Sequence, residues 1–435
     1  MDADRSVREA ASSILVALGI AAAAIGCGVG PGGRAAPVEH DAGGGVLTND
    51  AGTGTGQGNG NDGGDAGPSS AADGGASTTP PDVTPGAPIV APDGVWTTVP
   101  FPEGYCRDGT QARLVVHLNS ASQKVAIYEE GGGACFNDDS CKLLTFDLPS
   151  YTMGQGIFNF TNADNPIRDW NIFYVPYCTG DVHAGDNLVG EPGPLTGTTR
   201  YTGYTNIKLY LSRILATVPA PTDVLLTGSS AGGFGSGLTA DLVTRNMPAS
   251  VQRFTLLDDS GPPMSSQYMP SCLQTQWSSV WGFTNSILKD CGATCPGPST
   301  FVSAWTQFLI DKYARGAASQ KFMAGLVSST GDSIISSFFG FGANDCTSPT
   351  PVPLTSSQFE AGLMDIRSST QTQTDRFGTF YYDSTAHTTL ILDTGQQTTG
   401  VGLLGGLYDT QVNGVKLTDW IRDLLDHKQA AQVGP

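Results

Sequence analysis

The first 95 residues of this 435-residue chain contain no phenylalanine, tyrosine or tryptophan. They are rich in glycine, alanine, aspartate, serine and threonine, and such a segment cannot bury enough apolar surface to offset the entropy lost on ordering it. This absence excludes a folded domain at the N-terminus. We expect residues 28–95 to form a disordered linker and residues 96–435, from Trp96 onward, to form one folded domain.

Basic residues are also scarce, because lysine and arginine number 22 against 40 aspartates and glutamates, for a formal net charge of −18. Nucleic acids and anionic membrane surfaces would be repelled by this charge, so we exclude both as main partners. Motifs typical of metal sites are equally few. The loop "CTGDVHAGD" carries Asp181, His183 and Asp186, but their spacing has no distinctive ligand geometry, and we expect neither a metal nor another cofactor.

The N-terminal apolar run, "SILVALGIAAAAIGC" at residues 13–27, is too short to span a membrane comfortably. Arg5 and Arg8 precede it, as in an export signal. The small residues before Cys27 resemble a bacterial lipoprotein cleavage box, in which the cysteine becomes lipid-modified. We therefore expect residues 1–27 to be a signal peptide. The mature protein is expected to be exported, and either secreted or anchored to the bacterial cell envelope through Cys27.

The cysteine count fits export. Of the nine cysteines, eight remain when Cys27 is set aside. An even number in an oxidising compartment favours disulfides over metal ligands. The short spacing from Cys135 to Cys141 indicates one local bridge, and spacing leaves the other pairings open.

From Trp96 onward, short β-rich runs alternate with helical segments, which predicts an α/β fold with a mainly parallel central sheet flanked by helices. The expected strands are 112–118, 124–130, 171–177, 223–228, 253–259 and 388–393, and the expected helices 233–246, 301–316 and 417–429. The region 262–350 carries four cysteines and scattered prolines, so we expect it to be an insertion or lid more than sheet.

A candidate nucleophile lies in "VLLTGSSAGGFGSG", residues 224–237, where Gly228 to Gly232 spell G-x-S-x-G. A β-rich run precedes this pattern and a helical segment follows it, which is the setting in which an α/β-hydrolase holds its serine at a strained strand-to-helix turn. We predict that Ser230 is a nucleophile. The alternative is a glycine-rich turn with two incidental serines.

A serine nucleophile needs a base, and the chain has only five histidines. His40 lies in the expected linker, and His427 ends an amphipathic helix, where a cation suits the helix dipole. The chain order in α/β-hydrolases is nucleophile, acid, histidine, so His117 and His183 come too early. His387 remains as the predicted base.

The base needs a carboxylate to orient it, from a residue between the serine and the histidine. Asp332 is one candidate; Asp258 and Asp259, at the end of the expected strand "RFTLLDD", are the others. The residues alone leave this choice open.

An oxyanion formed during acyl transfer needs backbone N–H donors. The segment "IYEEGGGACFN" places three glycines after an early strand, which matches the HGGG-type loop of esterases. We expect donors from Gly132 and Gly133, with a further N–H from Ala231, the residue after the serine.

Five segments, "EGGGACFN", "FYVPYCTGD", "LLTGSSAGGFG", "AHTTL" and "YDTQVNGVKLTDWI", together and in this order resemble the pectin acetylesterase family, which includes the animal protein deacylase Notum. The resemblance covers nearly all of residues 96–425. It implies an α/β-hydrolase fold, Ser230 as nucleophile, His387 as base, Asp332 as acid, the same oxyanion donors, and disulfides Cys106–Cys178 and Cys135–Cys141.

The resemblance implies a serine esterase that hydrolyses O-acetyl or other small acyl esters through an acyl-enzyme, on a polysaccharide such as pectin. One departure bears on the acyl group: plant and animal members carry a tryptophan in the glycine loop, whereas Ala134 follows Gly133 here. The aromatic wall of the acyl pocket is therefore expected to be missing. The alternatives are a carboxylesterase or deacylase acting on longer acyl chains of lipid or protein, and a non-catalytic surface-binding lipoprotein.

Overall fold

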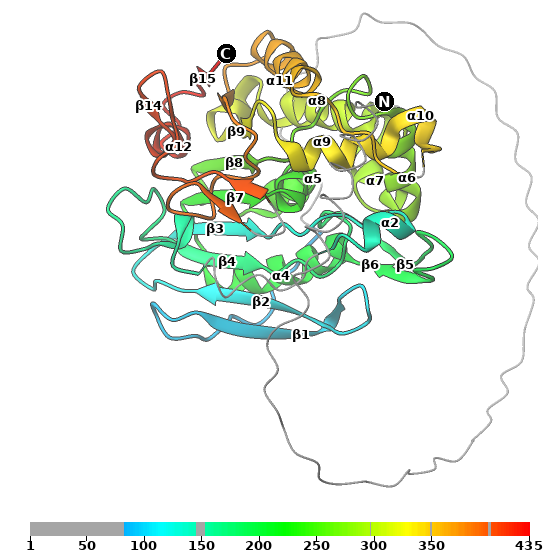
Figure 1. Ribbon diagram of the computed structural model, residues 1–435. Coiled ribbons are helices and arrows are strands. Elements are labelled where there is room, and N and C mark those ends of the chain that lie inside the picture. Colours follow the sequence, from blue (N-terminus) through cyan, green and yellow to red (C-terminus); the bar gives the residue numbers. More distant parts are fainter. Residues whose placement is uncertain (1–81, 145–152, 296, 349, 399–401) are drawn as a thin grey trace, which may run out of the picture. The chain divides into compact units, whose positions relative to one another are not determined.

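The computed structural model describes residues 82–144, 153–295, 297–348, 350–398 and 402–435 (Figure 1). The expected signal peptide, Cys27 with its lipid anchor, and the linker up to residue 81 lie outside the described residues. Within the described part of the chain, no helix is both long enough and apolar enough to cross a membrane.

Nine strands of the described residues form one central sheet in the order β1-β2-β4-β3-β7-β8-β9-β10-β15. From β4 to β15 every neighbouring pair is parallel, and β1 and β2 add an antiparallel edge. The predicted fold class, a mainly parallel sheet flanked by helices, is confirmed. The strands are β1 (Thr97–Tyr105), β2 (Gln111–His117), β3 (Lys124–Glu129), β4 (Asn171–Val175), β7 (Asp223–Ser229), β8 (Arg253–Asp259), β9 (Phe322–Ser329), β10 (Phe377–Tyr382) and β15 (Gln432–Val433).

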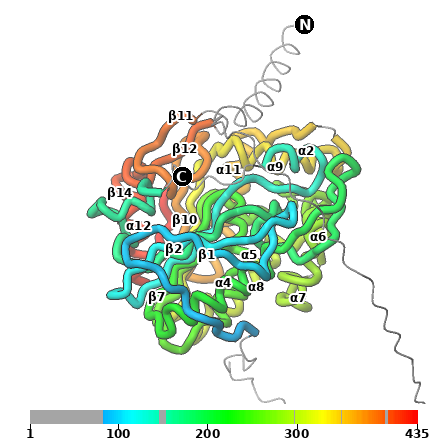
Figure 2. Tube along the Cα trace, turned by 90° about the horizontal axis from the view of Figure 1, so that it is seen from below, coloured from blue at the N-terminus to red at the C-terminus, as the bar shows by residue number. Residues whose placement is uncertain are grey.

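Helices cover both faces of the sheet. Alternate residues of a strand point to opposite faces, so Ile127 of β3 packs with one apolar cluster and Tyr128 with the other. The first cluster includes side chains of α4, α5, α6, α8 and α11, and the second those of α12. Figure 2 shows α12 at the left and α6 and α7 at the right. The helices are α2 (Asp138–Cys141), α4 (Gly203–Thr217), α5 (Ala231–Asn246), α6 (Ser271–Trp281), α7 (Ile287–Cys291), α8 (Phe301–Tyr313), α9 (Ser333–Phe339), α10 (Ala343–Cys346), α11 (Ser356–Gln371) and α12 (Leu417–Leu425).

Three sequence-based expectations about the elements need correction. The segment 388–393 was expected as a strand but is a loop. The strand in this part of the chain is β10, which begins eleven residues before position 388. The region 262–350 is not only an insertion, because it contains β9, which lies between β8 and β10 in the sheet. The sequence of β9, "FMAGLVSS", hides this strand because alanine, glycine and serine have low strand propensity.

The third correction concerns where the packed chain begins. Residues 82–95, assigned to the linker from sequence, pack against the domain: Val83 and Ile89 are buried, although no aromatic residue accompanies them. The N–H of Val83 donates to Asn246 Oδ1 at 2.9 Å, and the N–H of Ile89 donates to Thr217 Oγ1 at 2.8 Å. These two hydrogen bonds and the burial of Val83 and Ile89 in the apolar core hold the segment against the domain.

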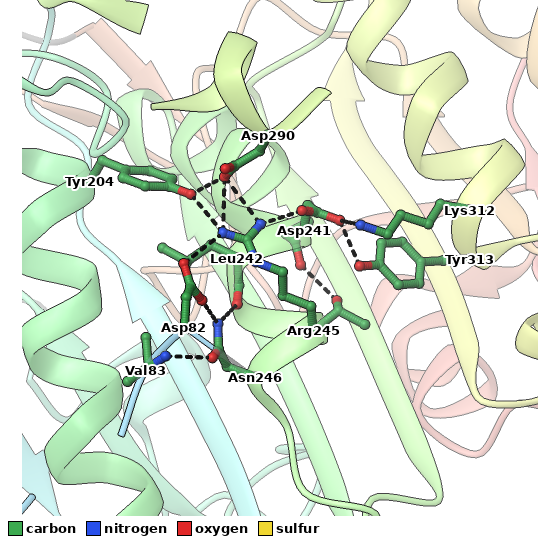
Figure 3. A network of polar contacts seen from close by, with 12 residues as sticks. Asp82, Val83, Tyr204, Asp241, Leu242, Arg245, Asn246, Asp290, Lys312 and Tyr313 are labelled. Atoms are coloured by element: carbon green, nitrogen blue, oxygen red, sulfur yellow. Dashed lines mark hydrogen bonds and ion pairs between the residues drawn. The ribbon is translucent and has the colours of Figure 1, made fainter. Parts of the chain in front are cut away.

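A network around Arg245, at the last turn of α5, holds the start of this segment (Figure 3). Its guanidinium forms ion pairs with Asp82, Asp241 and Asp290. Burial alone would raise the pKa of Asp82, but hydrogen bonds from Arg245 and Asn246 outweigh it and lower this pKa to about 2. Asp82 is therefore an anchor of the segment that leads into the sheet.

Four disulfides join the eight cysteines of the described residues. Cys135–Cys141 matches the pair that spacing indicated, and Cys106–Cys178 matches the pair that the family resemblance implied. The remaining bridges are Cys272–Cys346, which ties α6 to α10, and Cys291–Cys295.

Candidate active site

Ser230 lies at the turn between β7 and α5, with φ of 60° and ψ of −120°. A left-handed φ in a non-glycine residue is strained, and small neighbours are needed to reach it. A Cβ on Gly232 would lie 1.8 Å from the carbonyl oxygen of Glu129, and one on Gly228 would lie 2.2 Å from the carbonyl oxygen of Gly232. The glycines of G-x-S-x-G are thus required by sterics, and Ser230 stays partly exposed at the top of the sheet while Ser229 is buried.

His387 and Asp332 form a buried hydrogen-bonded pair. Nδ1 of His387 lies 2.8 Å from Oδ2 of Asp332, and the two residues are 4% and 0% exposed. Oδ1 of Asp332 accepts from the N–H groups of Ile334 and Ile335 at 3.0 Å, so that this residue also caps α9. A proton on Nδ1, held by the carboxylate, leaves Nε2 of His387 as the nitrogen with a lone pair.

The three residues all follow the carboxyl ends of parallel strands. Ser230 follows β7 directly, Asp332 comes three residues after β9, and His387 comes five residues after β10. The loop that carries His387 turns back across the sheet, because the N–H of Thr388 donates to Oγ of Ser260, just beyond β8, at 3.1 Å. One edge of the sheet therefore presents all three predicted residues.

The glycine loop passes against this turn. A Cβ on Gly131 would lie 2.9 Å from Cβ of Ser230 and 2.5 Å from the carbonyl oxygen of Ser229. Among the described residues, no acceptor is found for the N–H groups of Gly132 and Gly133. Ala231 is the first residue of α5, and the N–H groups of a first helical turn have no partner within the helix. These three N–H groups are available to bind an oxyanion.

Asp258 and Asp259, the other acid candidates, have different partners. Oδ1 of Asp258 accepts from the N–H of Gly261 at 2.7 Å, and burial raises the pKa of Asp258 to about 8. The carboxylate of Asp259 accepts from the Ser229 hydroxyl and from the N–H of Thr389. Neither carboxylate is hydrogen-bonded to His387, whose Nδ1 is taken by Asp332.

Asp181 and His183 of the loop "CTGDVHAGD" have hydrogen-bond partners within the protein. Nε2 of His183 lies 2.8 Å from the carbonyl oxygen of Glu130, and burial lowers the His183 pKa to about 4. Asp181 accepts from the Thr179 hydroxyl and from the N–H of Gly203. In the described part of the chain, no group of three His, Cys, Asp or Glu side chains is placed to hold a metal ion.

One aromatic residue near the site escaped the sequence analysis. Cζ of Phe338, on α9, lies 3.5 Å from the position that a Cβ on Gly133 would take. An aromatic ring therefore lies beside the glycine loop, although Ala134 follows Gly133 in the sequence. The signal was the aromatic run that follows Asp332, "SFFGF", at residues 337–341.

Part of the chain resembles a known family. A family model described as Pectinacetylesterase matches residues 99–296, which include the glycine loop and Ser230. Over these residues the chain is similar to the pectinacetylesterase family. The matched range ends before Asp332 and His387, so it carries no information about the acid or the base.

Relatives similar to this chain include the palmitoleoyl-protein carboxylesterases NOTUM of Homo sapiens and notum1a of Danio rerio. The human protein is 29% identical over 154 residues, which are 33% of this chain and 30% of that protein. The Danio rerio protein is 30% identical over 151 residues, 32% of this chain and 29% of that protein. The aligned part of the chain spans under a third of these relatives' length.

A solved structure of the Wnt deacylase Notum from Drosophila has a similar fold. It matches with a TM-score of 0.55 at 16% identity, over 78% of this chain and 95% of the Notum chain. This likeness shows the α/β-hydrolase-like fold alone.

Proposed function

We propose that this protein is a serine esterase that hydrolyses O-acetyl or similarly small acyl esters, on an acetylated polysaccharide such as pectin. The observation that carries the proposal is the 2.8 Å hydrogen bond between Asp332 and His387, at the same sheet edge as the strained turn of Ser230. A buried carboxylate on Nδ1 is the arrangement that makes Nε2 a base.

In the proposed reaction, the hydroxyl oxygen of Ser230 attacks the ester carbonyl while Nε2 of His387 takes the hydroxyl proton. Asp332 stabilises the imidazolium that forms. The N–H groups of Gly132, Gly133 and Ala231 donate to the oxyanion of the tetrahedral intermediate. His387 then gives the proton to the departing alcohol, and a water molecule, deprotonated by the same nitrogen, cleaves the acyl-enzyme to release acetate.

Two features support the proposed substrate: an aromatic ring near the oxyanion loop and disulfides typical of an exported protein. The ring of Phe338 lies beside Gly133, whose N–H is a proposed oxyanion donor, and we infer that this ring limits the acyl group to a small one. The four disulfides support an exported protein, as an acylated polysaccharide outside the cell requires. Residues 1–27 would then be the signal peptide, and Cys27 the site of a lipid anchor.

A longer acyl chain on lipid or protein is the second candidate, because the curated relatives are named palmitoleoyl-protein carboxylesterases. Comparing kcat/KM for acetyl and octanoyl p-nitrophenyl esters separates the two. Preference for octanoate by the wild-type enzyme would favour the second candidate. If Phe338 limits the acyl group, Phe338→Ala should shift the preference toward octanoate.

The nucleophile is tested by Ser230→Ala, with p-nitrophenyl acetate as substrate and a fluorophosphonate as covalent probe. We expect turnover to fall to background and labelling to be lost, whereas the neighbouring Ser229→Ala should stay labelled. A folded Ser230→Ala variant with wild-type turnover would disprove the assignment. An unlabelled, inactive wild-type protein would point to a binding protein instead.

A further inference from the structure

Asp259, the last residue of β8, is fully buried between the nucleophile strand and the loop that carries the histidine. On one side its carboxylate accepts from the hydroxyl of Ser229 at 2.7 Å. On the other side it accepts from the N–H of Thr389 at 2.9 Å and from the N–H of Leu390 at 3.0 Å. One side chain thus joins two segments that lie some 160 residues apart in the sequence.

The backbone around Asp259 extends the same connection. The carbonyl oxygen of Asp259 accepts from the N–H of Ser230 itself at 2.8 Å. The hydroxyl of the next residue, Ser260, accepts from the N–H of Thr388 at 3.1 Å. Asp259 therefore holds Ser230 directly, and Ser260 holds Thr388, the residue after His387.

This pair also accounts for strained backbone at the site. Ser230, Ser260 and Thr388 have φ of 60°, 64° and 59°, and a β-branched residue such as Thr388 rarely adopts this region. Strained conformations persist only where the surroundings over-determine them. The hydrogen bonds that Asp259 and Ser260 accept bear directly on two of the three residues.

Asp259 does not act as the acid of the histidine. The imidazole Nδ1 of His387 is occupied by Asp332, and the partners of the Asp259 carboxylate are backbone N–H groups and serine hydroxyls. An effect of Asp259 on the chemistry must therefore pass through the positions of Ser230 and His387.

We propose that Asp259 is a positioning residue for the hydrolysis, which holds the histidine loop (residues 387–390) and the end of β7 at one fixed separation. The inference rests on the proposed function. A displacement of about 1 Å between reacting groups costs about 10²-fold in rate, so a single buried carboxylate can matter this much without touching the substrate.

The test replaces Asp259 by asparagine. Both carboxylate oxygens accept from the N–H of Thr389, so in either orientation the NH₂ group of asparagine would face that N–H with a second donor. We expect kcat for p-nitrophenyl acetate to fall about 10²-fold while KM stays within about threefold, because substrate binding does not depend on the separation of Ser230 and His387. The rate of labelling by a fluorophosphonate should fall in parallel. A merely structural role would instead lower the melting temperature without this division between kcat and KM.

Asp258→Asn is the matched control, because Asp258 is the preceding residue of the same strand and its carboxylate accepts from the N–H of Gly261 and from no group of the histidine loop. It should keep kcat within about threefold of wild type. If Asp259→Asn does not fold, the double variant of Ser229→Ala and Ser260→Ala takes its place. This double variant retains the Asp259 carboxylate but removes the hydrogen bond from Ser229 and the hydrogen bond from Thr388 to Ser260. Its kcat should fall at least about tenfold at constant KM.

A folded Asp259→Asn enzyme with wild-type kcat would overturn the positioning role, as would a folded double variant with wild-type kcat. Ser230→Ala distinguishes this result from failure of the proposed function. If Ser230→Ala loses turnover and Asp259→Asn keeps it, only the positioning role fails. If Ser230→Ala keeps turnover, the proposed function fails and the positioning role fails with it.

Discussion

Replacement of Asp332 by asparagine should separate two tasks of one carboxylate. Oδ2 receives the proton-bearing Nδ1 of His387, and Oδ1 caps α9 by accepting from the N–H groups of Ile334 and Ile335. Asparagine is as good a helix N-cap as aspartate, so its oxygen can keep the cap and the variant should fold. Its amide then faces the imidazole with a donor where wild type has an acceptor.

The consequence for catalysis follows from the imidazole tautomer. With an amide N–H directed at Nδ1, this nitrogen must accept, and the ring proton moves to Nε2. His387 can then no longer take the proton of Ser230. Loss of the correct tautomer and of imidazolium stabilisation costs about 10⁴-fold in kcat, or about 5.4 kcal/mol of transition-state free energy.

Asp332→Ala provides the comparison, since it removes both tasks. Its kcat should fall as far as that of Asp332→Asn, but it should also lose about 0.5–2 kcal/mol of stability, because the N–H groups of Ile334 and Ile335 lose their cap. Turnover is measured with p-nitrophenyl acetate, and stability by denaturant unfolding.

Two results would refute this reasoning about Asp332. A folded Asp332→Asn enzyme within tenfold of wild-type kcat would show that the 2.8 Å hydrogen bond to His387 is not part of the catalytic machinery. A larger loss from Asp259→Asn than from Asp332→Asn would make Asp259 the acid.

Three further predictions address the oxyanion loop, a buried acid and the N-terminal anchor. A Cβ on Gly131 would lie 2.5 Å from the carbonyl oxygen of Ser229, so Gly131→Ala should displace the glycine loop and lower kcat at least about tenfold in a steady-state assay. Burial raises the pKa of Asp258 from 3.8 to about 8, so the folded state holds a proton that the unfolded chain releases. The contribution of Asp258 to stability is present below pH 3.8 and is lost as the pH rises toward 8, with a limiting slope of about 1.4 kcal/mol per pH unit. Asp258→Asn should remove this slope from the free energy of unfolding, measured with denaturant at pH 5, 6 and 7. Arg245→Ala should lower the free energy of unfolding by about 2 kcal/mol, less than for a fully buried pair because Asp82 is 39% exposed.

Each of these predictions has a contrary outcome. Wild-type kcat in Gly131→Ala would mean that the loop does not need close contact with the serine turn. Equal pH slopes for wild type and Asp258→Asn would mean that Asp258 is ionised in the folded protein at neutral pH. Arg422, whose ion pair with Asp419 is exposed, is the control for Arg245. If both alanine variants lose the same free energy of unfolding, the ion pairs of Arg245 stabilise the protein no more than an exposed pair does.

The local features of this protein were readable from the sequence because short-range sterics determine them. Gly228 and Gly232 flank Ser230 since no Cβ fits there, and the glycine loop is recognisable for the same reason. The alternation of β-rich and helical runs predicted the mainly parallel sheet correctly. His387 followed from chain order, because few histidines were available.

Tertiary structure decided what depends on which strands become neighbours. The sequence left three carboxylates open, and the position of β9 beside β10 brings Asp332 to an imidazole 55 residues away. The apolar run at 388–393 looked like a strand, but the Asp259 carboxylate binds the N–H groups of Thr389 and Leu390, and Thr388 adopts a left-handed φ. Contacts between segments that are distant in the sequence, which no local pattern encodes, thus determine how the site is assembled.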